Sequence, residues 1–165
     1  MSRSLAFAAL LALLLAQTCT LAALAAAQNP RSAERRWKDR GDDVLIDQKT
    51  RLEWSRLDNG REIDWHEAKR YCDGKHDGWR LPDLTELMAI YDSSVSGTVC
   101  LRALCHLSAY FDLTGEWFWS ATPVGADGSD GSELTWGVLM VNGAKTGSVR
   151  EASYGARALC VRNPS

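Results

Sequence analysis

The sequence predicts an α+β domain in which two helices pack on small antiparallel sheets joined by long loops. Two observations carry this prediction. First, two short segments begin with capping patterns and then repeat apolar residues at helical spacing. Second, segments of strand length alternate apolar with polar residues and end in turn-forming residues, which is typical of antiparallel strands.

The first 27 residues are predicted to be an export signal. The segment from Leu5 to Ala27 follows Arg3 and has no charged residue. This segment ends in three alanines, residues 25–27. Small residues are what a signal peptidase requires, so we expect cleavage after Ala27 and no membrane span in the exported chain. Two alternatives remain open, because roughly 20 apolar residues also suffice for a membrane anchor and Cys19 could carry a lipid. Export places the protein in the periplasm, outside the cell or at its surface.

Size and charge limit what the exported chain can be. Roughly 138 residues remain, enough for one domain and too few for two. The sequence has 21 acidic and 19 basic residues, whereas a nucleic-acid binder needs a basic face. The basic cluster from Arg31 to Arg40 contains two acidic residues. We interpret residues 28–42 as a polar leader and predict the domain over residues 43–162, with no nucleic-acid partner.

The first half of the domain is predicted to hold a hairpin and two helices. An apolar run at 44–46 and an alternating segment at 52–54 form the two arms of the hairpin. Capping patterns then predict a helix over 65–73 and a second helix that begins after Asp83 and ends near Asp92.

The second half is predicted to hold strands and two long loops. Residues 93–116 show no period, so we expect an irregular loop with one short helical turn around Leu101–Cys105. A strand at 117–120 and a glycine-rich loop at 124–132 follow. The remaining strands are expected at 136–141, 145–150 and 158–162, the first two joined through Asn142-Gly143, a strong two-residue hairpin signal.

Six short motifs share their order and spacing with one known family. They are Asp47-x-x-Thr50-x-Leu52-x-Trp54, Trp65-x-x-Ala68-x-x-Tyr71-Cys72, Trp79-Arg80-Leu81-Pro82-x-x-x-Glu86-Leu87, Trp119-Ser120-x-Thr122, Trp136-Gly137-Val138 through Asn142-Gly143, and Arg157-x-x-Cys160-Val161-Arg162. In this order they resemble the Lcl C-terminal domain, long catalogued as a domain of unknown function. The resemblance departs at Arg51, where the family often has glycine and a left-handed turn is less favourable for arginine, and at Ala121, where serine is usual.

The resemblance implies a C-type-lectin-like fold, which supplies a topology and not a function. Members occur in exported and surface proteins of bacteria, and one is an adhesin tail that binds host polysaccharide. By analogy we expect a polysaccharide or protein ligand and no cofactor. Cys72, Cys100, Cys105 and Cys160 form an even set in a chain bound for an oxidising compartment. Lectin-like folds imply a bridge from Cys72 to Cys160, which leaves Cys100 to pair with Cys105; the crossed pairings stay formally open.

Candidate ligand-binding residues are loop aromatics and loop carboxylates. They are Tyr110, Trp117, Asp127, Asp130 and Glu133. Sugars stack on exposed aromatics, and the carboxylate spacing leaves calcium open, although we predict no metal. No catalytic residues are identified. We therefore expect a non-catalytic binding module acting through the loops at 93–116 and 123–133. The alternatives are a periplasmic enzyme related to formylglycine-generating oxidases, which use a similarly spaced cysteine pair, and a structural partner domain of an envelope assembly.

Overall fold

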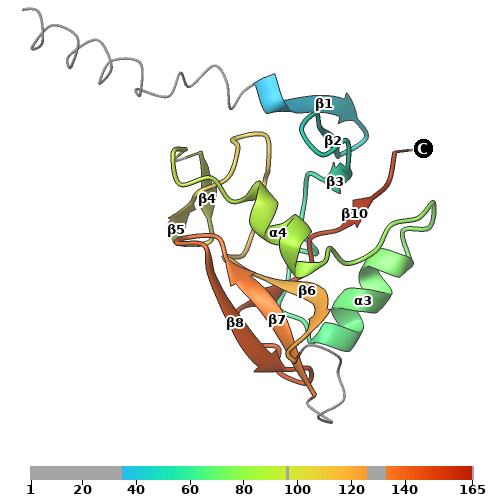
Figure 1. The fold of residues 1–165 in the computed structure, drawn as a ribbon, viewed down its shortest axis with the longest axis vertical. Coiled ribbons are helices and arrows are strands. Elements are labelled where there is room, and N and C mark those ends of the chain that lie inside the picture. Colours follow the sequence, from blue (N-terminus) through green and yellow to red (C-terminus); the bar gives the residue numbers. More distant parts are fainter. Residues whose placement is uncertain (1–34, 96, 126–132, 165) are drawn as a thin grey trace, which may run out of the picture. The chain divides into compact units, whose positions relative to one another are not determined.

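The computed structural model describes residues 35–95, 97–125 and 133–164, and Figure 1 labels its helices and strands. The predicted signal peptide, residues 1–27, lies outside the described residues. Within the described part of the chain, no helix is long and apolar enough to cross a membrane. The described elements are two helices and ten strands in three sheets, which confirms the α+β class.

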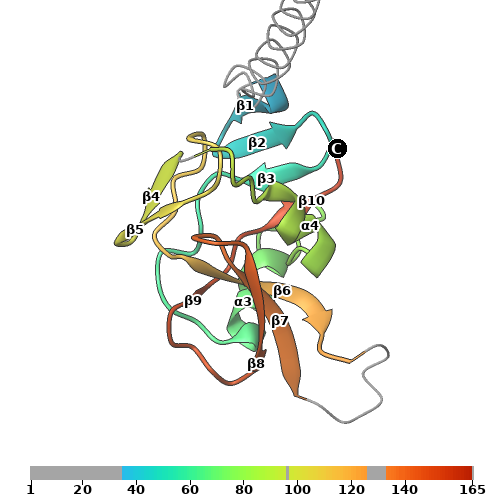
Figure 2. The same ribbon diagram turned by 60° about the vertical axis from the view of Figure 1, so that its left-hand side comes forward.

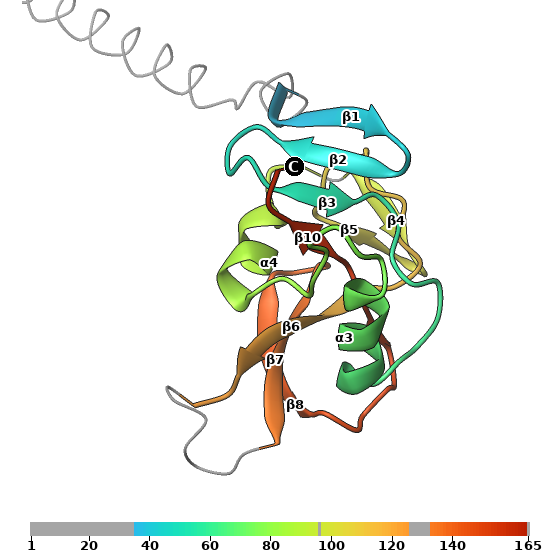
Figure 3. The ribbon, with the colours of Figure 1, turned by 90° about the vertical axis from the view of Figure 1, so that its right-hand side faces the viewer.

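One sheet brings the two ends of the domain together. Its order is β1-β2-β3-β10 and all its pairings are antiparallel. The strands are β1 Trp37–Gly41, β2 Val44–Asp47, β3 Glu53–Ser55 and β10 Val161–Arg162, stacked in this order in Figure 3. The turn between β2 and β3 holds Arg51 at φ 65°. This is the left-handed conformation for which the family often supplies glycine, and it costs other residues roughly 1–2 kcal/mol.

The second half of the predicted polar leader belongs to the fold. β1 pairs with β2, and its first residue, Trp37, is 5% exposed and packs edge-to-face on Phe111 with ring centroids 4.8 Å apart. Arg36 binds both carboxylate oxygens of Asp47, at 2.8 and 2.6 Å. The sequence did not predict this strand because nearly all of its residues are polar or charged. It is attached to the core by one large aromatic residue, Trp37, and by the ion pair beside it.

Both predicted helices are present. Helix α3 spans Trp65–Asp73, as predicted, and the Asp64 carboxylate accepts a hydrogen bond from the Glu67 amide. Helix α4 spans Leu84–Ile90 and begins with a complete capping box, in which Asp83 and Glu86 each accept the other's backbone N–H. It ends before Asp92 because the backbone of Tyr91 is extended, at φ −67° and ψ 133°.

The predicted helical turn around Leu101–Cys105 is wrong. This segment is a hairpin of β4 Thr98–Cys100 and β5 Ala103–Cys105, which we call the finger hairpin. Figure 2 shows it projecting from the body of the domain. Leu101 enters the two-residue turn at φ 52°, and the disulfide between Cys100 and Cys105 joins the two strands. The spacing of the apolar residues does not reveal that a covalent ring and a left-handed residue form a hairpin here.

The largest pairing surface is the sheet β8-β7-β6-β9. It contains β6 Trp117–Pro123, β7 Leu134–Leu139, β8 Ala144–Val149 and β9 Ala156–Arg157, the last parallel to β6. The predicted β7–β8 hairpin is present, but four residues lie between the last paired residues, Leu139 and Ala144. Met140 leaves the ladder because it is fully buried and its backbone instead bonds Glu116 and His106.

The two faces of this sheet lie against different helices and different cores. Phe118 and Val138 belong to the larger core with Leu87 and Ile90 of α4. On the other face, Trp119 packs in a second core with Ala68 and Cys72 of α3 and with the chain leading to β10. Figure 3 shows α3 and α4 on opposite sides of β6 and β7. On the sheet face that packs against α3, the helix covers the part near β6 and leaves the part near β8 uncovered.

Candidate functional site

An open groove lies on the uncovered part of the α3 face of the sheet. It has a volume of about 230 Å³. Its floor comes from β6 and β8, and its wall comes from the segment 150–156, which leads to β9. The lining residues are Trp117, Trp119, Thr146, Gly147, Ser148, Ala152, Tyr154 and Ala156.

Trp117 is held rigidly in the floor of this groove. Its indole Nε1 donates a hydrogen bond to Thr146 Oγ1 at 2.8 Å, and its ring meets Trp119 edge-to-face with centroids 4.6 Å apart. Gly137 on β7 lies directly beneath the ring, where a Cβ atom would overlap the indole. The absence of a side chain at this glycine therefore lets the indole lie across β7 to reach β8.

Tyr154 stands on the wall with 94% of its surface exposed. Within the described part of the chain, neither its hydroxyl nor that of Ser148 makes a hydrogen bond, and Thr146 Oγ1 keeps its own hydrogen to donate. The wall begins at Arg150, whose Nε donates to Thr135 Oγ1 at 3.0 Å and whose guanidinium lies 4.8 Å from the Trp65 ring centroid. The groove thus combines the rings of Trp117 and Tyr154, and the buried ring of Trp119 behind them, with hydroxyls able to bind a ligand.

The lining residues limit the chemistry of the groove. None of the eight carries a carboxylate, an imidazole or a thiol, which are the groups most used for acid–base and covalent catalysis. Among the described residues, no three His, Cys, Asp or Glu side chains are grouped as a metal site requires. The arrangement suits a neutral polar ligand with a flat apolar face.

The predicted ligand residues are not gathered in one place. Trp117 lines the groove, and Glu133 lies next to its wall, since its carbonyl accepts the Arg150 amide at 3.0 Å. Tyr110 is 40% exposed in the loop after β5 and does not line the groove. Asp127 and Asp130 lie outside the described residues. Sequence reasoning missed Thr146 and Ser148. These two residues lie on the same face of β8, and only the pairing register of β6, β7 and β8 shows that this face is the one that carries Trp117.

The four cysteines form two disulfides. Cys72 on α3 is joined to Cys160, just before β10, across 88 residues of sequence. Cys100 is joined to Cys105 in the finger hairpin. All four side chains are fully buried. These are the pairs that the lectin-like resemblance implied.

Apart from Trp119, which lines the groove, and Gly137, which lies beneath Trp117, the motif residues described below stabilise the fold. Arg80 binds both Glu86 oxygens, at 2.8 and 2.7 Å, while its backbone pairs with Val161. Burial alone raises the pKa of Glu86, but hydrogen bonds from Arg80 and from the Asp83 amide outweigh it, so the pKa lies below its ordinary value. Thr122 Oγ1 accepts the Leu84 amide at the start of α4.

The Asp47 motif is likewise a structural cluster. Burial raises the pKa of Asp47, but hydrogen bonds from Arg36, Thr50 and the Lys49 amide outweigh that effect and the net pKa is lowered. The carboxylate of the buried Glu53 forms two ion pairs, one with Arg162 Nε at 2.7 Å and one with Arg40 Nη1 at 2.6 Å. Of the groove's hydroxyl residues, Thr146, Ser148 and Tyr154 all fall outside the six motifs. The motif residues therefore serve mainly the scaffold, and Trp119 is the one lining residue of the groove that belongs to a motif.

Comparison with known proteins agrees with the motifs. The sequence profile of the Lcl C-terminal domain matches residues 43–162, which is most of the chain. No curated protein matches it. The matched span begins at the turn before β2 and ends with β10, so it contains both disulfides, both helices and the groove. The chain belongs to the Lcl C-terminal domain family.

Proposed function

We propose that this protein is an exported, non-catalytic binding module that takes a sugar ring of a glycan in the groove beside Trp117. The observation that carries the proposal is the fixed indole of Trp117, which lies next to the exposed ring of Tyr154. A rigid aromatic surface binds the apolar face of a ring with little loss of side-chain entropy. A volume of about 230 Å³ suits one or two sugar rings rather than a long buried chain.

The polar groups of the groove support a sugar ligand over an apolar one. Thr146, Ser148 and Tyr154 present hydroxyls, which both donate and accept hydrogen bonds, as sugar hydroxyls do. An apolar ligand would leave these groups without partners, and this lowers affinity. The lining residues provide no acid–base pair, which supports a binding role rather than glycan cleavage.

Two disulfides support export, because such bonds persist in oxidising compartments. We place the protein in the periplasm or at the cell surface, where polysaccharides are abundant. An enzyme related to formylglycine-generating oxidases would need Cys100 or Cys105 as a free thiol, and both belong to a buried disulfide. The binding module is therefore the better-supported function.

The test is binding to an array of neutral, sialylated and sulfated oligosaccharides, followed by titration of the strongest ligand. Tyr154→Ala is the informative variant, since its side chain is almost fully exposed and its loss leaves the core intact. We expect roughly tenfold weaker binding, the effect of losing about 1.4 kcal/mol of stacking.

Tyr110→Ala is the matched control, because Tyr110 is also an exposed tyrosine but does not line the groove. It should bind as the unsubstituted protein does. A loss confined to Tyr110→Ala would move the site to the loop after β5, and equal losses in the two variants would reject the groove as the specific site. The absence of any array ligand would reject glycan binding.

A further inference from the structure

The finger hairpin carries an exposed aliphatic face that the groove does not use. Val99, Leu101 and Leu104 are 66%, 58% and 53% exposed. Val99 and Leu104 are directly paired across β4 and β5, so their side chains share one face, and Leu101 occupies the turn. The opposite face holds the buried Cys100–Cys105 bond. The hairpin thus presents three large aliphatic side chains to solvent.

The hairpin is braced in this position. Isolated two-stranded hairpins are marginal in water, and here the disulfide joins the strands. Thr98 Oγ1 donates to the Phe111 carbonyl at 2.9 Å, and Gly97 lies so close to the 107–109 backbone that a Cβ atom would overlap it. Leu101 occupies the left-handed region at φ 52°, where glycine or asparagine would be less strained. A strained, exposed leucine at a braced tip indicates a role for its side chain.

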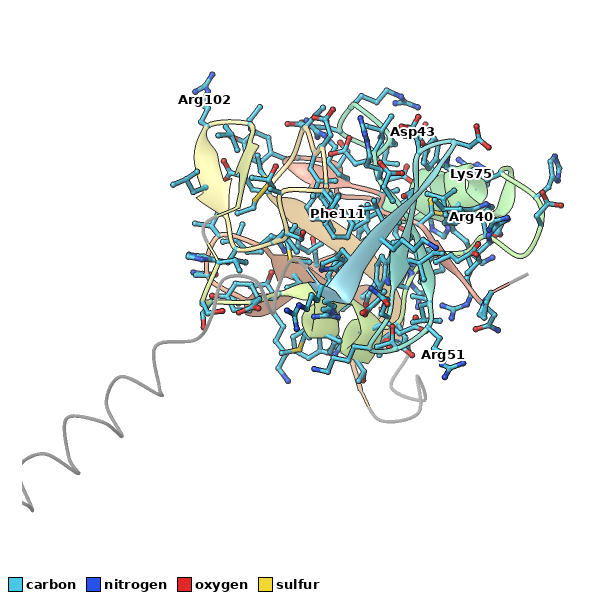
Figure 4. All side chains as sticks on the ribbon, turned by 90° about the horizontal axis from the view of Figure 1, so that it is seen from above. Arg40, Asp43, Arg51, Lys75, Arg102 and Phe111 are labelled. Atoms are coloured by element: carbon cyan, nitrogen blue, oxygen red, sulfur yellow. A yellow bond between two sulfur atoms is a disulfide. The ribbon has the colours of Figure 1, made fainter. Side chains whose placement is uncertain are left out.

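Charge around the hairpin indicates what it contacts. No Asp or Glu occurs between Asp92 and Asp112, although the chain has 21 acidic residues. One carboxylate from outside this segment, that of Glu116, lies at the turn and accepts the Arg102 amide at 3.4 Å. Arg102, at the tip, points away from the domain (Figure 4), and Tyr110 is exposed in the loop that follows β5. Aliphatic side chains with a cation at the tip suit the interface of a bilayer, where anionic headgroups attract arginine.

We propose that the finger hairpin inserts Leu101, Val99 and Leu104 into the surface of a membrane that contains anionic lipids. The contact is distinct from the glycan groove, so a module bound to the membrane could still hold a ligand. The aliphatic composition also favours lipid over a protein partner, because energetically dominant residues of protein interfaces are enriched in Trp, Tyr and Arg, whereas Leu and Val are under-represented.

The test uses the full chain, exported by a bacterium and purified in the N-terminal form that export leaves, with every variant in that same form. Partition is measured by flotation with vesicles of phosphatidylglycerol and phosphatidylethanolamine, and hydrogen exchange locates the contact. We expect vesicle-dependent protection of residues 98–105. Leu101→Ser with Leu104→Ser should lower partition at least about tenfold, since each leucine transferred out of water changes an equilibrium by roughly that factor.

Two further variants separate membrane contact from misfolding and from general hydrophobicity. Leu101→Gly relieves the left-handed residue, so it should keep or raise the melting temperature while it weakens partition. Met88→Ser with Val149→Ser removes two exposed apolar side chains from other elements and should leave partition unchanged. The proposal is overturned if the control lowers partition as much as the finger variant, or if vesicles protect no residue of the finger. Without vesicle protection, a protein partner would be the better explanation for the aliphatic face.

Discussion

The two disulfides hold regions of opposite character. The Cys72–Cys160 bond spans 88 residues and joins α3 to the segment before β10, inside a core of small and aromatic side chains. The Cys100–Cys105 bond spans 5 residues and fixes a hairpin whose outer face is exposed. The long bridge restricts the whole unfolded chain, whereas the short one restricts only a local loop. One therefore stabilises the fold and the other shapes a surface.

The largest effect is expected from removing the long bridge. Cys72→Ala with Cys160→Ala should lower the free energy of unfolding by about 4–5 kcal/mol, since a loop of this length loses that much closure entropy. Urea unfolding followed by tryptophan fluorescence measures the change. A loss no larger than that of the short bridge would contradict the comparison.

The sheet beside the long bridge should depend almost as strongly on a buried ion pair. Asp47→Asn leaves Arg36, whose side chain is 15% exposed, without its carboxylate, and we expect a loss of about 3 kcal/mol. Because the folded pKa of Asp47 is lowered, its contribution is complete above the ordinary pKa of 3.8 and is lost as the pH falls below it.

Unfolding measured from pH 6 down to about pH 2 tests this sign. The unsubstituted protein should lose stability steeply over the acid range, and Asp47→Asn should lose less of it. Parallel curves for the two proteins would show that Asp47 is not responsible.

Removing the short bridge should have a smaller effect on stability. Cys100→Ala with Cys105→Ala should lower the free energy of unfolding by about 2 kcal/mol and leave glycan binding unchanged, since neither residue lines the groove. Alkylation of the unsubstituted folded protein should detect no free thiol. A reactive thiol at either position would instead favour the oxidase alternative.

The smallest expected effect is an increase in stability, from a substitution in the sheet that the long bridge ties to α3. Arg51→Gly places glycine at φ 65° and should raise the free energy of unfolding by about 1 kcal/mol. Thermal melting at neutral pH detects a shift of a few degrees, roughly 4 °C or more for this size. A decrease would mean that the Arg51 side chain contributes more than its backbone strain removes.

The sequence predicted those parts of the fold that depend on local patterns. The caps at Asp64 and Asp83, the strands around Trp54 and Trp119, and the family motifs all reflect spacing that is visible in one segment at a time. Trp37 was misjudged because its placement depends on a distant partner, Phe111. The finger hairpin was misjudged although its Cys100–Cys105 disulfide was expected, because a ring of this size does not by itself distinguish a helical turn from a hairpin.

The candidate site was predicted less completely than the fold. Trp117 was identified because it is an aromatic residue near a loop, but its partners on β8 and on the 150–156 segment required the sheet register and the path of the chain into β9. Single-sequence reasoning has no means of bringing Tyr154 next to Trp117, which is 37 positions earlier in the numbering.

The Cys72–Cys160 bond also determines how the domain responds to pulling. The groove and the finger hairpin both lie between these two cysteines, so tension applied at the two chain ends passes through the sulfur–sulfur bond and bypasses them. Such a force could peel β1, β2 and β3 from the sheet and unwind α3, but it could not extend the 88 residues within the bridge. A module anchored at one end and held at the other would therefore keep its ligand site unloaded under shear.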